Sequence, residues 1–254
     1  MRFTKMHGLE NDFVVVDEPF SADSEMIAAL CHRRTGVGAD GVLAVGRRAA
    51  NVTMRYWNAD GSPAEMCGNG LRCVARYALE RGFASAEAMV IETPVGERRA
   101  VVGRDLVEVE LGPVDLGDTV EVDGREYRTA SVGNPHAVTV VADPDGVDVA
   151  GIGRRVEADR RFPDGTNVEF MAFDGPGSIR LRVWERGVGE TRACGTGMAA
   201  AAMVASRETG VDEISVAVPG GTGRIRFSDG AAWLSGPAEF VFTGTWPGEL
   251  SEPS

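Results

Sequence analysis

Lysine is nearly absent from this chain. Lys5 is its single lysine, although the 254 residues include 26 Lys and Arg, against 38 Asp and Glu, and the formal net charge is −12. Nucleic acids and anionic membrane surfaces are bound mainly through positive side chains, so this balance argues against both as partners. Two alternative explanations of the Lys-poor, acidic composition are a GC-rich genome and adaptation to high salt.

Long apolar runs are also missing. The N-terminal stretch "MRFTKMHGLENDF" contains no uninterrupted apolar segment, which argues against a signal peptide. No run approaches the ~20 residues needed to cross a bilayer. The Ala-rich stretch from Met198 to Ala205 predicts a buried helix instead. The sequence therefore predicts a cytoplasmic protein that does not engage a membrane.

Cysteine and histidine are scarce. The chain has 3 His and 4 Cys, namely Cys31, Cys67, Cys73 and Cys194. They form neither a CxxC pair nor a regular disulfide spacing, and the few His do not complete a zinc-binding pattern. We expect free thiols in a reducing compartment and no bound metal.

What the sequence does contain is an internal repeat. "MCGNGLRC" holds Cys67 and "ACGTGMAA" holds Cys194, and their offset, 194 − 67 = 127, persists upstream. At that offset "VTMRYW" lies over "IRLRVW", and "RTGVGADGVLAV" lies over "RFPDGTNVEFMA". The period is far longer than a solenoid repeat, so the chain is interpreted as two homologous halves.

Each half predicts strands around one helix. Alternating, β-branched segments predict strands, and the runs behind the two Cys-Gly turns predict helices over 68–81 and 195–208. A further amphipathic helix is expected after Ser21 or Asp23, and a hairpin around Asp123-Gly124. The segments "VTMRYW" and "SIRLRVW" are the matched predicted strands of the two halves. The other predicted strands are "AMVIET", "RRAVVG", "LVEVEL", "HAVTVV", "ISVAV", "GRIRF" and "AEFVF". The expected fold class is α+β, with two pseudo-symmetric half-domains, each a mostly antiparallel sheet wrapped around a central helix. We expect the two half-domains to span residues 1–112 and 113–238. A strand near residues 239–246 is a candidate to complete the sheet of the first half-domain. The active site is expected in the cleft between the two half-domains.

The two matched cysteines point to proton transfer. A helix N-terminus carries unpaired N–H groups and partial positive charge, so it binds anions and stabilises a thiolate. Two such ends would offer one thiolate to remove a proton from a carbon and one thiol to return a proton to its opposite face. A carboxylate on that carbon would be held by the same N–H groups as negative charge develops.

Two other classes of function compete. A cysteine hydrolase or transferase would use one thiol with His136 and Asn134, but it would leave the second Cys-Gly turn unexplained. An inactive binding protein on the same fold would be expected to have lost a cysteine or Arg186, and both cysteines and Arg186 are present.

The motifs resemble those of the diaminopimelate epimerase family. They are "KMHGLENDFVVVD", "GVGADGV", "NADGSPAEMCGNGLRC", "GNPHAV", "GTNVEF" and "ERGVGETRACGTG", in the family's order. The resemblance implies a homodimeric enzyme that interconverts LL- and meso-2,6-diaminopimelate without a cofactor, in lysine and peptidoglycan biosynthesis. A racemase of another amino acid on the same fold is the alternative.

The resemblance also assigns residues. It implies that Cys67 and Cys194 are the acid/base thiols and that His136 and Glu185 tune them. It implies that the substrate is bound by Asn11, Asn58, Gly68, Asn69, Asn134, Asn167, Glu185, Arg186, Gly195 and Thr196. Glu10 departs from the family pattern, where many members have Gly. We expect Cys31, Cys73, Trp57 and Trp184 to be core residues, and Arg55 and Arg182 to tie strands together.

Overall fold

The computed structural model describes residues 1–64, 66–85 and 87–247. The described chain forms two compact units, the first built from Met1–Val109 together with residues 236–247, and the second from Glu110–Ser235. The sequence-based division after residue 112 falls slightly further along the chain. No helix in the described residues is long and apolar enough to cross a membrane.

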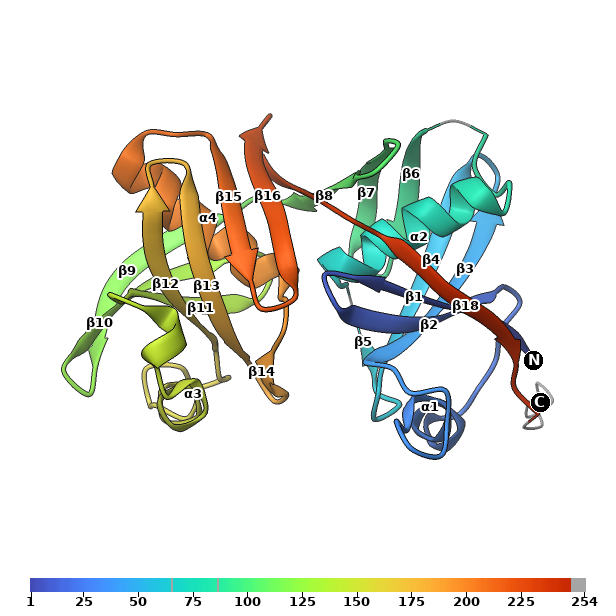
Figure 1. Ribbon diagram of the computed structural model, residues 1–254, viewed down its shortest axis with the longest axis horizontal. Coiled ribbons are helices and arrows are strands. Elements are labelled where there is room, and N and C mark those ends of the chain that lie inside the picture. The colour runs from blue at the N-terminus through green and yellow to red at the C-terminus, as the bar shows by residue number, and fades with distance from the viewer. Residues whose placement is uncertain (65, 86, 248–254) are drawn as a thin grey trace. The chain divides into compact units, whose positions relative to one another are not determined.

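The first unit is a mixed sheet around one helix (Figure 1). Most neighbouring strands are antiparallel, and β2–β3 and β4–β6 are parallel pairs. The C-terminal strand β18 returns to pair with β1. The elements are β1 (Arg2–Gly8), β2 (Asn11–Asp17), α1 (Ser24–Cys31), β3 (Gly41–Arg48), β4 (Asn51–Asn58), β5 (Pro63–Ala64), α2 (Gly68–Glu80), β6 (Ala88–Thr93), β7 (Gly96–Val102), β8 (Val107–Gly112) and β18 (Glu239–Thr245).

Helix α2 is enclosed by this sheet. It contacts β1, β2, β3, β4, β6 and β7, and its first eight residues are all buried. Leu71, Val74 and Ala78 have no exposed surface. Such burial on every side of the helix start fixes the position of the residue that precedes it, Cys67.

The second unit repeats this plan. Its parallel pairs are β11–β12 and β13–β15, and its other neighbours within the unit are antiparallel. The elements are β9 (Asp115–Val122), β10 (Arg125–Ser131), β11 (Pro135–Val140), the 3₁₀ turn η1 (Pro144–Gly146), α3 (Val149–Glu157), β12 (Asn167–Gly175), β13 (Ser178–Glu185), β14 (Gly189–Thr191), α4 (Gly195–Thr209), β15 (Glu213–Val218), β16 (Gly221–Ser228) and β17 (Ala231–Gly236).

Helix α4 occupies the place in this unit that α2 has in the first. Its residues from Met198 to Ala202 have no exposed surface, and it contacts β10, β11, β12, β13, β15 and β16. It ends at Thr209 and is capped by Gly210, whose φ of 74° is left-handed, a conformation that glycine adopts without steric cost. The fold class is thus α+β, with a mixed, mostly antiparallel sheet around one central helix in each unit.

Helix α3 is absent from the predicted elements. Its two glycines, Gly151 and Gly153, lower the helix propensity of the segment and hide its pattern. The reason for Gly153 is tertiary, because a Cβ there would lie 2.5 Å from Trp184. Trp184 belongs to a core cluster that includes Val149, Val156 and Phe170.

The matched arginines tie segments together as expected. Arg55 forms an ion pair with Glu18 at 2.6 Å and also donates to the carbonyl of Phe20. Arg182 pairs with Glu190 at 2.7 Å and donates to the carbonyls of Pro144 and Val147. Cys31 and Cys73 are buried, as predicted for core residues.

Candidate active site

Both predicted cysteines are N-cap residues. Cys67 has an extended backbone (φ −137°, ψ 121°), and its Sγ accepts the N–H of Gly70 at 3.5 Å. Cys194 has nearly the same backbone (φ −119°, ψ 112°), and its Sγ accepts the N–H of Gly197 at 3.4 Å. A cap side chain that accepts this N–H lies at the positive end of the helix, where a negative sulfur is stabilised.

The first unit surrounds Cys67 with amide groups. Its Sγ donates to Oδ1 of Asn11 at 3.4 Å, and Nδ2 of Asn69 donates to the same oxygen at 3.2 Å. The structure therefore brings three of the predicted residues together. Asn58 lies at the end of β4, and its Nδ2 donates to Ser62 at 3.0 Å.

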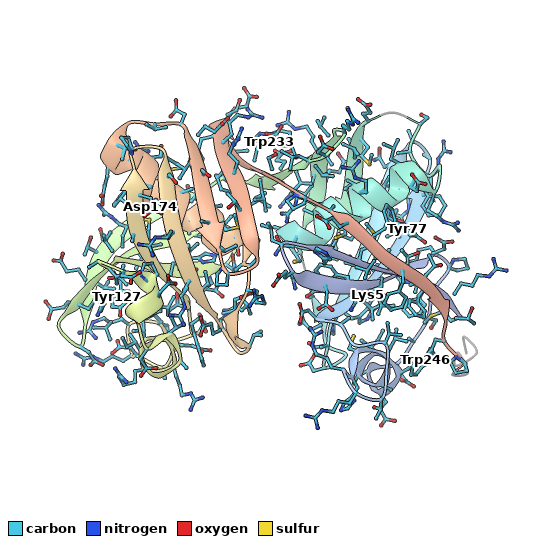
Figure 2. The ribbon with its side chains drawn as sticks, viewed as in Figure 1. Lys5, Tyr77, Tyr127, Asp174, Trp233 and Trp246 are labelled. Carbon is cyan, nitrogen blue, oxygen red and sulfur yellow. The ribbon has the colours of Figure 1, made fainter. Side chains whose placement is uncertain are left out.

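The orientation of the Asn11 amide is fixed from behind by an ionic network. Nδ2 of Asn11 donates to Asp40 at 2.8 Å, which leaves Oδ1 for Cys67. Asp40 and Asp12 both pair with Arg33 at 2.7 Å, and Lys5 (Figure 2) pairs with Asp12 at 2.5 Å and also donates to the carbonyl of Gly38. Burial raises the pKa of Asp12, but hydrogen bonds from Arg33 and Lys5 outweigh it and lower that pKa to about 2.

Glu10 stands in the turn between β1 and β2. Its φ is 61° and that of Leu9 is 55°, so both residues are left-handed. Glycine adopts this conformation without a Cβ clash, which gives a steric reason why a glycine suits this position.

The second unit connects Cys194 to buried titratable groups. Its Sγ lies 3.5 Å from Oγ1 of Thr196, which accepts from Nδ2 of Asn134 at 3.4 Å. Oδ1 of Asn134 lies 3.0 Å from Nε2 of His136, and Nδ1 of His136 lies 2.7 Å from Oε1 of Glu169. His136 and Glu169 have no exposed side-chain surface.

Glu185 adds a second carboxyl next to this cysteine. It is held by Thr191, whose Oγ1 donates to it at 2.5 Å, and it is hydrogen-bonded to Cys194. Burial raises the pKa of Cys194 well above its ordinary value, and the charge of Glu185 raises it further. Burial likewise raises the pKa of Glu185 and that of Glu169.

Asn167 and Arg186 form a separate pair. The Nδ2 of Asn167 donates to the carbonyl of Pro135 at 2.8 Å, and its Oδ1 accepts the backbone N–H of Arg186 at 3.0 Å. Arg186 is exposed, and its Nη1 donates to the carbonyl of Asp164 at 3.1 Å. An exposed guanidinium beside a fixed amide suits the binding of a carboxylate from solution.

Sequence reasoning missed several residues of these networks, among them Asp40 and Glu169. The repeat contained a signal for Asp40, because it occupies the position that Asn167 has in the second half. Glu169 is a single acidic residue in the apolar segment "VEFMAF", two residues after Asn167 in a buried strand. A lone carboxyl in such a position is expected to have a buried partner.

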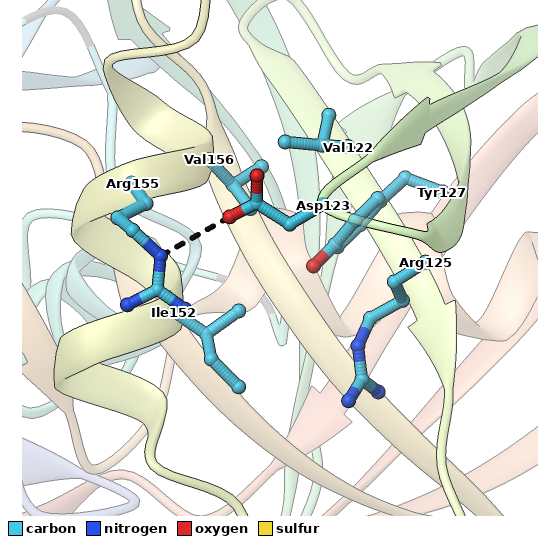
Figure 3. A pocket seen from close by; sticks show the side chains of 7 residues that line it. All are labelled: Val122, Asp123, Arg125, Tyr127, Ile152, Arg155 and Val156. Carbon is cyan, nitrogen blue, oxygen red and sulfur yellow. Dashed lines mark hydrogen bonds and ion pairs between the residues drawn. The ribbon is translucent and has the colours of Figure 1, made fainter.

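One hollow lies elsewhere in the second unit (Figure 3). It has a volume of about 120 Å³ and is lined by Val122, Asp123, Arg125, Tyr127, Ile152, Arg155 and Val156. None of the predicted site residues lines it. Among the described residues, no group of three or more His, Cys, Asp or Glu is placed to hold a metal ion.

Several known proteins with similar sequences are described as diaminopimelate epimerases. Residues 3–117 and 128–241 match the family model for diaminopimelate epimerase. A diaminopimelate epimerase of Thioalkalivibrio sulfidiphilus (strain HL-EbGR7) is 42% identical, over 96% of this chain and 98% of its own length. That of Thermobifida fusca (strain YX) is also 42% identical, over 96% of this chain and 97% of its own.

More distant structures share the fold. A putative phenazine biosynthesis protein of Clostridium difficile (strain 630) has a TM-score of 0.75 at 12% identity and covers 97% of this chain and 99% of its own. A hydroxyproline epimerase of Agrobacterium vitis, solved with bound trans-4-hydroxy-L-proline, has a TM-score of 0.66 at 16% identity and covers 96% of this chain and 90% of its own. By the sequence matches, this chain belongs to the diaminopimelate epimerase family.

Proposed function

We propose that this protein interconverts LL- and meso-2,6-diaminopimelate by proton exchange at one α-carbon. The observation that carries the proposal is the pair of N-cap cysteines, Cys67 and Cys194, at matched positions of the repeat. Membership of the family supports the same reaction.

The proposed chemistry needs two sulfurs in opposite protonation states. A thiolate takes the α-proton, the C–H electron pair moves into the substrate carboxylate as an enediolate, and the other thiol returns a proton to the opposite face. One S–H bond forms and one breaks, so no electrons are gained or lost. The N–H groups of Gly68 and Asn69, and of Gly195 and Thr196, are the proposed donors to the reacting carboxylate, because both pairs begin buried helices.

The remaining polar residues are proposed to select the substrate. Arg186, exposed at the end of β13, would bind the distal carboxylate. Asn11, Asn58, Asn134 and Asn167 would bind the zwitterionic ends, because an amide both donates and accepts. Glu185, with a hydrogen bond to Cys194, would keep that thiol protonated, and His136 would orient Asn134.

Solvent isotope exchange tests this proposal. The protein is incubated with LL-diaminopimelate in D₂O, and the α-carbon is followed by NMR. We expect deuterium at the α-carbon together with formation of the meso isomer, without added pyridoxal phosphate and in the presence of EDTA. Exchange with another amino acid but not with diaminopimelate would indicate the alternative racemase, and loss of activity in EDTA would contradict the mechanism.

We further propose a homodimer that works in the cytoplasm, in lysine and peptidoglycan precursor synthesis. Support for the dimer comes from β18, where Phe240, Val241 and Phe242 are each about half exposed. Adjacent large apolar residues in an exposed strand favour a protein contact. Support for the cytoplasm comes from the chemistry, since both cysteines must stay reduced.

A further inference from the structure

Among the residues that the structure describes, Arg72 is the largest completely buried side chain. It lies in the second turn of α2 with 0% of its surface exposed. Its Nε donates to the carbonyl of Pro237 at 3.2 Å, but its Nη1 and Nη2 have no hydrogen-bond partner among the described residues. Burying a charged group with unused donors is strongly unfavourable, so a residue that only fills space would be apolar here.

The guanidinium lies beside the first turn of α2. A Cβ on Gly8 would be 2.9 Å from Nη2 of Arg72 and 3.3 Å from the carbonyl oxygen of Asn69, the second residue of that helix. A Cβ on Gly236 would be 3.3 Å from Nε of Arg72. Two glycines therefore make room for the group next to the helix end that Cys67 caps.

The charge of Arg72 acts on sulfur. Burial lowers the pKa of Arg72 to about 10, which leaves it protonated at neutral pH. Among the described residues, the groups whose negative charge favours protonated Arg72 are Cys73 and Cys67. Burial raises the pKa of Cys73 to about 12, so that thiol stays neutral. The anion that remains for Arg72 is the thiolate of Cys67.

The strands that pack against α2 carry other charged groups, and most of these bind one another or backbone carbonyls. The ion pairs are Lys5–Asp12, Asp12–Arg33, His7–Glu239, Asp17–Arg81, Arg55–Glu18 and Arg48–Glu92. Arg47 donates to the carbonyl of Ala49, and Arg98 donates to the carbonyl of Glu97. Glu97 accepts a hydrogen bond from Asn51, and Arg99 also lies on β7.

The repeat shows that this charge is particular to one half. At the 127-residue offset, 72 + 127 = 199, and the second unit has Ala199 where the first has Arg72. In that unit the charges acting on Cys194 include those of Glu185 and Glu169, which disfavour a thiolate. The two helix N-termini are alike in backbone geometry, but the buried side chains that act on their cysteines carry opposite charges.

We propose that Arg72 is a positioning residue whose buried positive charge stabilises the thiolate of Cys67. The catalytic part of this statement rests on the proposed function, because it concerns a thiol assigned there as an acid/base group. The electrostatic part is measurable without turnover.

The test follows alkylation of Cys67 by iodoacetamide between pH 5 and 10, with the modified peptide quantified by mass spectrometry. Arg72→Met and Arg72→Gln remove the charge, Arg72→Lys keeps it, and Arg76→Met is the control on the same helix, since Arg76 is partly exposed and donates to the carbonyl of Gly103. We expect the pH midpoint to rise by about one unit or more in the neutral variants and to stay near wild type in Arg72→Lys and Arg76→Met.

An unchanged midpoint in a folded neutral variant would overturn the proposal, and so would a wild-type midpoint above the ordinary thiol value of about 8.5. The second criterion applies even if neither neutral variant folds. If the midpoint shifts in the neutral variants but the wild-type protein does not epimerise diaminopimelate, the proposed function is refuted and the role of Arg72 stands. If the wild-type protein epimerises diaminopimelate but the midpoint does not shift in the neutral variants, the proposed function stands and the role of Arg72 is refuted.

Discussion

His136 and Glu169 are hydrogen-bonded to each other in the interior of the second unit. Nδ1 and Oε1 are 2.7 Å apart, and neither side chain is exposed. On the other side of the ring, Nε2 faces Oδ1 of Asn134 at 3.0 Å, so Nε2 must carry a hydrogen to make that bond. Glu169 thus holds the imidazole in place, and the imidazole orients Asn134 toward Thr196.

Removing this carboxyl should destabilise the fold. In Glu169→Ala, Nδ1 of His136 is left buried without a partner beside a new cavity, and we expect the free energy of unfolding to fall by about 3 kcal/mol. Glu169→Gln, which retains a polar group of the same size, should cost less. Urea unfolding measures both, and a loss below about 1 kcal/mol for Glu169→Ala would contradict the structural role.

Each N-cap cysteine should be required for epimerisation. Cys67→Ser and Cys194→Ser should each lower turnover by at least about 10²-fold, because a serine hydroxyl is too weak an acid to exchange the proton. The matched control is Cys73→Ser in the same helix, which should retain turnover and lose about 1–3 kcal/mol of stability. A folded Cys194→Ser protein with full activity would refute the pairing of the two thiols.

The charge of Glu185 should hold Cys194 in its thiol form. Burial is the largest cause of the raised pKa of Cys194, and the charge of Glu185 is the second largest. Glu185→Gln removes a negative charge, so the pH midpoint of Cys194 alkylation should move down. Peptide mapping after iodoacetamide treatment measures it, and an upward shift would show that Glu185 favours the thiolate.

Acid should weaken the network behind Asn11. Asp12 titrates at about 2 in the folded protein against an ordinary 3.8, and its side chain is 17% exposed. A carboxyl with a lowered pKa stabilises the fold above its unfolded pKa, and this contribution disappears as the pH falls through the folded pKa. Asp12→Asn should therefore cost about 2 kcal/mol at pH 7, and the difference from wild type should shrink between about pH 4 and 2. A pH-independent difference in urea unfolding would argue against the ionic origin.

Arg182 should contribute to stability and leave catalysis unchanged. Its side chain is 20% exposed and binds Glu190 and the carbonyls of Pro144 and Val147. Arg182→Met should lower the free energy of unfolding by about 2 kcal/mol with kcat/KM unaltered. Arg155→Met is a suitable control, because its pair with Asp123 is exposed and should be worth less than about 1 kcal/mol. A fall in kcat/KM for folded Arg182→Met would indicate a role in the site.

Local pattern determined much of this protein. The 127-residue offset between Cys67 and Cys194 defined the repeat, and short alternating segments predicted most strands. The glycines after each cysteine and the apolar runs behind them predicted both central helices, because capping and periodicity are properties of neighbouring residues. The arginine pair in the matched strands and the buried Cys73 followed from the same patterns.

Tertiary structure decided what lies behind each sulfur. Asn11 and Cys67 are 56 positions apart, and His136 and Glu169 are 33 apart. Their contacts depend on strand register, such as the parallel pairing that sets His136 beside Asn167 and Val138 beside Glu169. Register is set by how whole strands pack, and a shift of one residue would turn Glu169 to the opposite face of the sheet. The sequence alone therefore identified two cysteines at helix ends, while packing buried the arginine that follows one of them and brought buried carboxyls to the other.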